Sequence, residues 1–134
     1  MKRGQKMKYK TIFFQDWGTF NGTTLVCVGW KNYAEIKEHL KKRKHWDWYN
    51  AMHHKPDEFD SHHFSKWKYK NRRFSLLFLK DYKPKFDYYN ILSHELVHAV
   101  MFMMSDYLEV EEESEAVAYQ HTYLMREIVK KLTP

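Results

Sequence analysis

Short runs of apolar and β-branched residues open the chain and are separated by turn residues. Residues 9–17 and 23–30 have the composition of β-strands, and the stretch from Gly18 to Gly22 between them predicts a hairpin turn. The single cysteine, Cys27, lies within the second run, so we expect it to be a buried, reduced strand residue.

The next segment follows a helical period. Asn32 can cap a helix over residues 33–44, in which Ile36 and Leu40 repeat at the i, i+4 spacing of a buried helix face. The pattern therefore predicts that an amphipathic helix follows the first two strands.

No clear period continues through residues 46–69, where we expect an irregular segment with a short helix at residues 46–52. A third strand is predicted over residues 73–82, and Pro84 breaks the chain after it.

Two helices are predicted in the C-terminal half. No Gly or Pro interrupts residues 88–108, which are rich in helix-forming apolar residues, and a second helix is predicted to continue to about Leu132. The glutamates at residues 109–113 are expected to be a mostly solvated helix start, because carboxylates favour the positive end of a helix dipole. The predicted fold class is α+β, with a small, mostly antiparallel sheet of about three strands and two packed C-terminal helices.

The stretch His94-Glu95-Leu96-Val97-His98 lies within the first of these two helices. Residues i and i+4 project from the same helix face, so His94 and His98 can bind one Zn²⁺ through neutral ring nitrogens. Glu95 lies about 100° around the helix, where it can act as general base toward a metal-activated water. The alternative interpretation is an ordinary helix face that carries two polar histidines.

A zinc site of this type needs a third protein ligand from a segment that folds back onto the first helix. Glu115 lies inside the second helix and is followed by the small residues Ala116 and Ala118, which would let the two helices approach each other closely. We therefore predict Glu115 as the third ligand, with Glu112 as the second choice.

These residues resemble a known pattern. The motif from His94 to His98, followed on the next helix by Glu115-Ala116, resembles the gluzincin arrangement of zinc metallopeptidases. Residues 113–119 are also similar to the Glu-x-Glu-Ala-Asn-x-Phe segment of small ImmA/IrrE-type metallopeptidases. Residues 74–132 as a whole resemble small bacteriophage proteins that read His-Glu-x-x-His-Ala, a gap, and then Glu-Ala-x-Ala-Tyr.

The chain departs from the family pattern at two positions. Val117 replaces the Asn, and Tyr119 stands where gluzincins often carry an Asp that supports a zinc-bound histidine. The resemblance nevertheless implies a minimal zincin-like fold, in which an edge strand borders the cleft and holds an extended substrate by main-chain pairing. The strand from Phe74 to Leu79 is the candidate for that role, with a central core strand as the alternative.

The implied reaction is peptide hydrolysis. Zn²⁺ would activate a water, Glu95 would take its proton, and the same ion would polarise the carbonyl that is attacked. A second electrophile is needed for the tetrahedral oxyanion. His121 and Tyr119 are tentative candidates, followed by Tyr123, because all three lie on the predicted helix that bears Glu115.

Basic residues concentrate in the N-terminal half and contribute to a formal net charge of +6 and a pI near 9.3. The run Lys41 to Lys44 and the residues from Lys66 to Arg73 are interleaved with aromatic residues, a pattern that can serve a single-strand groove. We instead expect a solvated face with its aromatic side chains turned inward, and no nucleic-acid partner.

Two pairs of adjacent histidines, His53-His54 and His62-His63, raise the question of a second metal site. Adjacent histidines point in different directions in a strand or a helix, so each pair would supply one ligand rather than two. A polar loop over the cleft explains the same residues, and we favour it.

Length and composition agree with a single domain over residues 1–134, in which residues 74–134 form the metal-binding half after the strands, helix and basic segment of residues 1–73. The chain is 43% hydrophobic and 18% aromatic, enough to bury one core. No apolar run of about 18 residues predicts a membrane span, and no signal-peptide core is evident. We expect a cytoplasmic protein, located in the host cytoplasm or the virion if it is phage-encoded.

Two functions from different classes are compatible with these patterns. The first is a zinc-dependent metallopeptidase that acts on a peptide or protein substrate. The second is a noncatalytic phage virion or assembly protein that retains the zincin fold and a structural metal. Glu95 favours the peptidase, because a structural site has no need of a general base.

Overall fold

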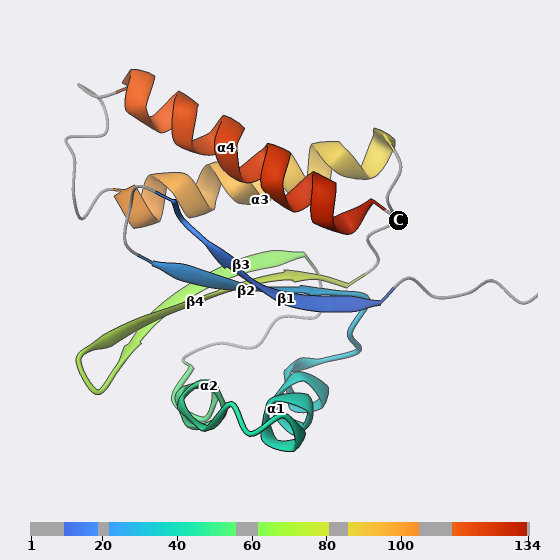
Figure 1. The fold of residues 1–134 in the computed structure, drawn as a ribbon, viewed down its shortest axis with the longest axis vertical. Coiled ribbons are helices and arrows are strands. Elements are labelled where there is room, and N and C mark those ends of the chain that lie inside the picture. The colour runs from blue at the N-terminus through green and yellow to red at the C-terminus, as the bar shows by residue number, and fades with distance from the viewer. Residues whose placement is uncertain (1–9, 19–21, 56–61, 81–85, 105–113, 134) are drawn as a thin grey trace, which may run out of the picture.

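A mixed β-sheet lies between two pairs of helices in the computed structural model of the protein (Figure 1). The structure describes residues 10–18, 22–55, 62–80, 86–104 and 114–133. Within these ranges the elements are, in chain order, β1 (Thr11–Asp16), β2 (Thr23–Val28), α1 (Tyr33–Lys42), α2 (Trp46–Met52), β3 (His63–Tyr69), β4 (Arg72–Leu79), α3 (Phe86–Met104) and α4 (Ser114–Leu132). Helices α3 and α4 cover one face of the sheet, and α1 and α2 cover the other (Figure 1).

The described strands follow the order β1-β2-β4-β3. Strands β1 and β2 are antiparallel, as are β3 and β4, whereas the central strands β2 and β4 run parallel. The alternation of side chains in β2 shows how both faces are buried: Leu25 and Cys27 face α1 and α2, and Val26 and Val28 face α3 and α4. The sheet therefore separates two apolar cores.

The hydrophobic pattern predicted the first helix well. Helix α1 is capped by Asn32, whose Oδ1 accepts a hydrogen bond from the backbone N–H of Glu35 at 2.9 Å. Ile36 and Leu40 are buried against the sheet, as their spacing predicted. Cys27 is also completely buried, and burial raises the pKa of its thiol.

The general α+β class is confirmed, but the predicted number of strands was wrong. The sheet has four described strands rather than about three, and it is mixed, because two of its strand pairings are antiparallel and the pairing of β2 with β4 is parallel. The additional strand is β3, which lies within the segment we expected to be irregular. Lys70 and Asn71 connect it to β4 with φ values of 50° and 61°, the left-handed pair of a type I′ hairpin turn, although neither residue is glycine.

A chain of hydrogen bonds crosses the sheet between side chains that are at most 4% exposed. The indole N–H of Trp17 donates to Thr24 Oγ1 at 2.8 Å, and Thr24 Oγ1 lies 2.8 Å from Ser75 Oγ. Because the Ser75 hydroxyl donates to the carbonyl oxygen of Thr23, the Thr24 hydroxyl must donate to Ser75. Each side-chain donor in this series of hydrogen bonds therefore has an acceptor.

The two C-terminal helices contact opposite edges of the sheet, α4 at β1 and α3 at β3. Helix α4 lies over β1, since Lys131 Nζ donates to Gln15 Oε1 at 2.6 Å and Gln120 Nε2 donates to the carbonyl oxygen of Trp17 at 2.9 Å. Helix α3 packs against α4 on one side and against β3 beneath it. None of the described helices has the length and apolar character that crossing a membrane requires.

Candidate metal centre

Helix α3 presents the His-Glu-x-x-His motif on the side opposite its core contacts. Leu92, Leu96 and Ala99 are at most 2% exposed and pack in the core between this helix and the sheet. His94 and His98 are exposed. The apolar spacing that fixes the helix on the sheet therefore also turns both imidazoles toward solvent, where an ion can reach them.

The two imidazole rings converge. Nε2 of His94 lies 3.2 Å from Nε2 of His98, and the ring centroids are 4.8 Å apart at an interplanar angle of 80°. Two ligands of a tetrahedral Zn²⁺, each about 2.0–2.1 Å from the ion, are separated by roughly 3.3 Å. The histidine pair thus fits two corners of a zinc site.

Glu95 is half-buried and lies on the side of α3 that is turned away from α4. Ser93 and Glu95 flank His94 in the helix, about 100° to either side of it. Ser93 faces α4, because its Oγ lies 3.4 Å from Nε2 of His121. Since α4 lies over β1 and α3 packs against β3, the carboxylate of Glu95 belongs to the side of the histidine pair nearer to β3.

The predicted third ligand begins the adjacent helix. Glu115 is the second residue of α4, as expected for a ligand on a helix that folds back onto α3, but its side chain is outside the described part of the structure. Glu112 and the other acidic residues before Ser114 also lie outside the described residues. Among the side chains that are described, no group of three metal-binding residues occurs. Glu115 and Glu112 remain predictions.

His121 is brought next to the motif. Its Nε2 lies 3.3 Å from the carbonyl oxygen of Ser93, the residue before His94, in addition to the contact with the Ser93 hydroxyl. A carbonyl can only accept, so this geometry fits an Nε2–H tautomer that leaves Nδ1 without a proton. Sequence reasoning identified His121 but gave no indication of Ser93 as its partner.

The two tyrosines of α4 are placed differently. Tyr119 is 71% exposed, and the described contacts do not link it to the histidine pair. Tyr123 lies at β1, where its hydroxyl donates to Asp16 Oδ1 at 3.4 Å. Burial, followed by the carboxylates of Asp16 and Glu127, raises the pKa of Tyr123. The structure does not bring Tyr123 to the motif, and the role of Tyr119 stays a prediction.

The strand from Phe74 to Leu79 takes the alternative, central position rather than the edge position. Residues Phe74 to Leu79 belong to β4, which pairs with β2 on one side and β3 on the other, so its backbone groups are not available to a substrate. Among the described strands, β3 is the one that lies at the edge of the sheet and packs against α3. A signal for it was present in the sequence, because buried Phe64 and Trp67 are interspersed with the exposed residues Lys66 and Lys68.

The paired histidines make separate local contacts. His53 Nδ1 lies 2.8 Å from the carbonyl oxygen of Tyr49, and the His54 ring stacks on Tyr69 at 4.5 Å between centroids. The described parts of the chain thus hold no second cluster of metal-binding side chains.

Comparisons with protein-family models, with curated proteins and with solved structures returned no match to this chain. Its function therefore has to be inferred from the residues and their geometry.

Proposed function

We propose that the chain is a zinc-dependent metallopeptidase with a minimal zincin-like fold. The observation that carries the proposal is the 3.2 Å separation of the Nε2 atoms of His94 and His98 on an exposed helix face. His94, His98 and Glu115 would hold the ion, with Glu112 as the alternative third ligand.

When bound, Zn²⁺ would supply Lewis acidity to a water and to the substrate carbonyl. Glu95 adjoins the pair on the side of β3 and is the proton acceptor, because a carboxylate oxygen can take a proton from water and later return it to the leaving amine.

His121 would complete the site from α4. Its contact with Ser93 holds the imidazole beside the first turn of the motif. In this role its Nε2–H would leave the Ser93 carbonyl and donate a hydrogen bond to the oxyanion that forms during hydrolysis. Replacing His121 by Ala should therefore lower kcat more than it weakens zinc binding.

Metal binding is the first test. Purified protein should contain about one Zn²⁺ per chain, and zinc titration by calorimetry should show the loss of this site in His94→Ala, His98→Ala and Glu115→Ala. His53→Ala is the matched control, since it removes an exposed histidine at the end of α2. If Glu115→Ala retains the ion and Glu112→Ala loses it, the third ligand is reassigned. If His94→Ala and His98→Ala retain it, the proposal fails.

Catalysis is the second test. Glu95→Gln should keep the ion and the fold but lose hydrolysis of a fluorescein-labelled casein probe, whereas Glu38→Gln on α1 should leave it unchanged. A general base contributes roughly 10²- to 10⁴-fold to the rate, which sets the expected loss. If Glu95→Gln hydrolyses the probe as fast as the unmodified protein does, Glu95 is not the general base. If the zinc-loaded protein hydrolyses no peptide bond in the probe, the metal is structural and the noncatalytic phage protein is the better account.

A further inference from the structure

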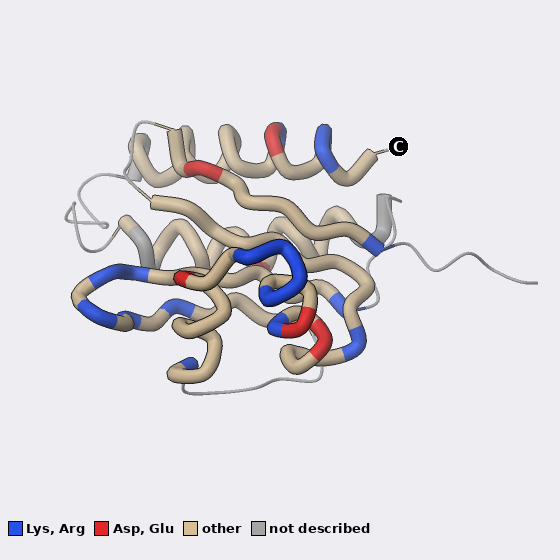
Figure 2. Tube along the Cα trace, turned by 60° about the horizontal axis from the view of Figure 1, so that its bottom comes forward, with Lys and Arg blue, Asp and Glu red and all other residues tan. Residues whose placement is uncertain are grey.

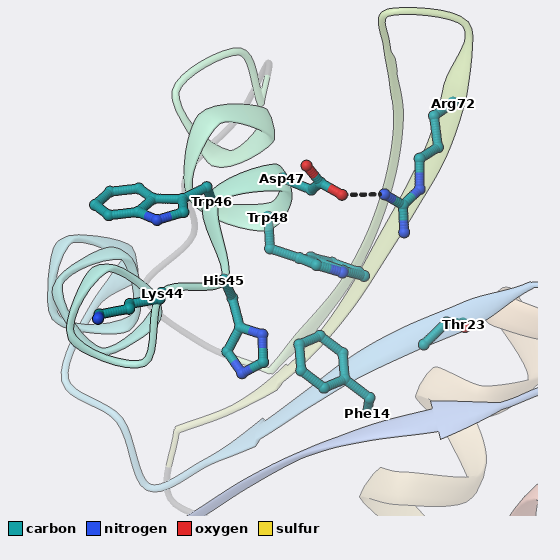
Figure 3. A pocket seen from close by; sticks show the side chains of 8 residues that line it. All are labelled: Phe14, Thr23, Lys44, His45, Trp46, Asp47, Trp48 and Arg72. Carbon is teal, nitrogen blue, oxygen red and sulfur yellow. Dashed lines mark hydrogen bonds and ion pairs between the residues drawn. The ribbon is translucent and has the colours of Figure 1, made fainter.

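A hollow of about 490 Å³ lies on the opposite face of the sheet, where α1 meets α2. It is lined by Phe14, Thr23, Lys44, His45, Trp46, Asp47, Trp48 and Arg72 (Figure 3). The rings of Phe14, His45 and Trp48 gather in its centre, the Asp47–Arg72 ion pair stands at one side, and Lys44 and Trp46 stand at the other (Figure 3). This volume is within the range of ligand-binding clefts.

The turn after α1 creates the hollow. Lys44 has a φ of 60°, and the N–H of His45 bonds back to the carbonyl oxygen of Leu40 at 2.9 Å, so the chain reverses immediately after the helix. This reversal exposes Trp46, whose side chain is 49% accessible. The expectation that the aromatic residues of this segment turn inward holds for Trp48 and Trp67, each 6% exposed, but not for Trp46.

A second hollow of about 310 Å³ adjoins the first one. The two share Phe14 and His45, whose rings meet edge to face at 5.1 Å between centroids, and the second adds Arg43 and His39 to the lining. Together they form a groove with two compartments, here called the α1–α2 groove. A ligand with repeating units fits such a groove better than a single compact molecule does.

Positive charge lies on two sides of this groove. Figure 2 shows basic residues at the end of α1, where Lys41 to Lys44 are all exposed, and along the β3–β4 hairpin. Of the hairpin residues, Arg72 lines the groove, whereas Lys66 and Lys68 lie on the other face of the sheet. The pKa of His39 is lowered, first by desolvation and then by Arg43 and other nearby basic groups, which is consistent with a positive local potential. Asp47 is the carboxylate in the lining, but its pair with Arg72 is exposed and therefore weak.

We propose that the α1–α2 groove binds single-stranded nucleic acid, with an unpaired base stacked on Trp46 and the phosphates contacted by Lys44, Arg43 and Arg72. An exposed indole in a hollow that also carries cations is suited to this ligand, because every base has a π-face and the backbone repeats its charge. Double-stranded nucleic acid fits this groove less well, since its bases are already stacked on one another. The proposal is independent of the metal centre, which lies on the other side of the sheet.

The test is fluorescence anisotropy with fluorescein-labelled oligo-dT and oligo-rU of about 12 nucleotides, within the usual site size of single-strand binders. Trp46→Ala should weaken binding roughly 5- to 100-fold, the range of base stacking on an aromatic ring, and Trp46→Phe should restore much of it. Arg43→Gln with Lys44→Gln should weaken binding and reduce the slope of log K against log salt by roughly 0.7 for each lost phosphate contact.

Lys31→Gln with Lys130→Gln is the matched control, because it removes two exposed positive charges away from the groove. The proposal requires that this control bind more tightly than the Arg43 and Lys44 double variant. It is overturned if the unmodified protein binds neither oligonucleotide at about 50 mM salt, if both double variants behave alike, or if a duplex binds as tightly as a single strand. It is also overturned if poly-glutamate displaces the oligonucleotide efficiently while Trp46→Ala changes nothing, a result that would indicate an acidic protein partner.

Discussion

Replacing Thr24 by valine breaks the buried hydrogen-bond chain at its centre. The substitution keeps the shape of the side chain but leaves the indole N–H of Trp17 without its 2.8 Å acceptor. Trp17 is only 2% exposed, so water cannot easily take the place of the hydroxyl. Ser75 is affected less, because its own hydroxyl still donates to the carbonyl oxygen of Thr23.

The loss of stability follows from the hydrogen bond that the Trp17 indole loses and the methyl group that valine adds. A buried donor without an acceptor destabilises a fold by about 1–3 kcal/mol, and the methyl group gained in valine returns less than about 1 kcal/mol. We therefore expect Thr24→Val to lower the free energy of unfolding by about 2 kcal/mol. For a domain of this size, such a loss lowers Tm by roughly 6–10 °C.

Urea denaturation followed by tryptophan fluorescence, together with a thermal melt, measures this loss. Thr24→Ser is the control, because it retains the hydroxyl and removes one methyl group, at a cost of about 1 kcal/mol. A double-mutant cycle with Ser75→Ala should show that the two hydroxyls are coupled. If Thr24→Val is no less stable than Thr24→Ser, the hydrogen-bond chain contributes nothing and the reasoning is wrong.

Two further predictions concern the pH dependence of stability and the β1–β2 turn. Because folding lowers the pKa of His39, the unfolded state takes up a proton at a higher pH than the folded state does, and the free energy of unfolding should fall as the pH drops through about 6.5. Urea denaturation across this pH range should show a smaller fall for His39→Gln than for the unmodified protein. An equal fall in the two proteins would contradict this prediction. Gly18 has a φ of 66°, and a Cβ there would lie 3.1 Å from the Tyr123 ring, so Gly18→Ala should cost about 1–2 kcal/mol in the same assay. Gly18→Asn, which tolerates this φ, should cost less unless the contact with Tyr123 dominates.

Local patterns predicted the elements whose determinants are close in sequence. The cap at Asn32 and the buried pair Ile36 and Leu40 depend on residues three and four positions apart, and the structure reproduces them. The hairpin pairing of β1 with β2 was predicted, but the parallel pairing of β2 with β4 was not, because these two strands meet across a long stretch of chain that contains α1, α2 and β3. The almost continuous apolar run from Phe74 to Leu79 is nevertheless typical of a strand buried on both faces, and it argued for the interior position that β4 occupies.

Strand β3 was missed because its alternation was interpreted as charge patterning. Lys66 and Lys68 lie on one side of the strand and Trp67 on the other, which is the period of two expected of an edge strand with exposed lysines. The turn at Lys70 and Asn71 also lacks the glycine that would have marked a hairpin. Tertiary pairing imposes a left-handed conformation there that local sequence preference does not indicate.

The two candidate sites differ in how far the sequence reveals them. His94 and His98 are one helical turn apart, so the helix alone brings their Nε2 atoms to 3.2 Å, and the spacing of the motif was sufficient to identify the pair. The α1–α2 groove combines Phe14 of β1 with His45 and Arg72, residues that only the folded sheet brings together. Strand β3 packs against α3 on one face of the sheet, and its hairpin leads into β4 at Arg72, which lines the groove on the other face. Changes at His94 or at Trp46 should each act on one site alone, because the sheet separates the two sites.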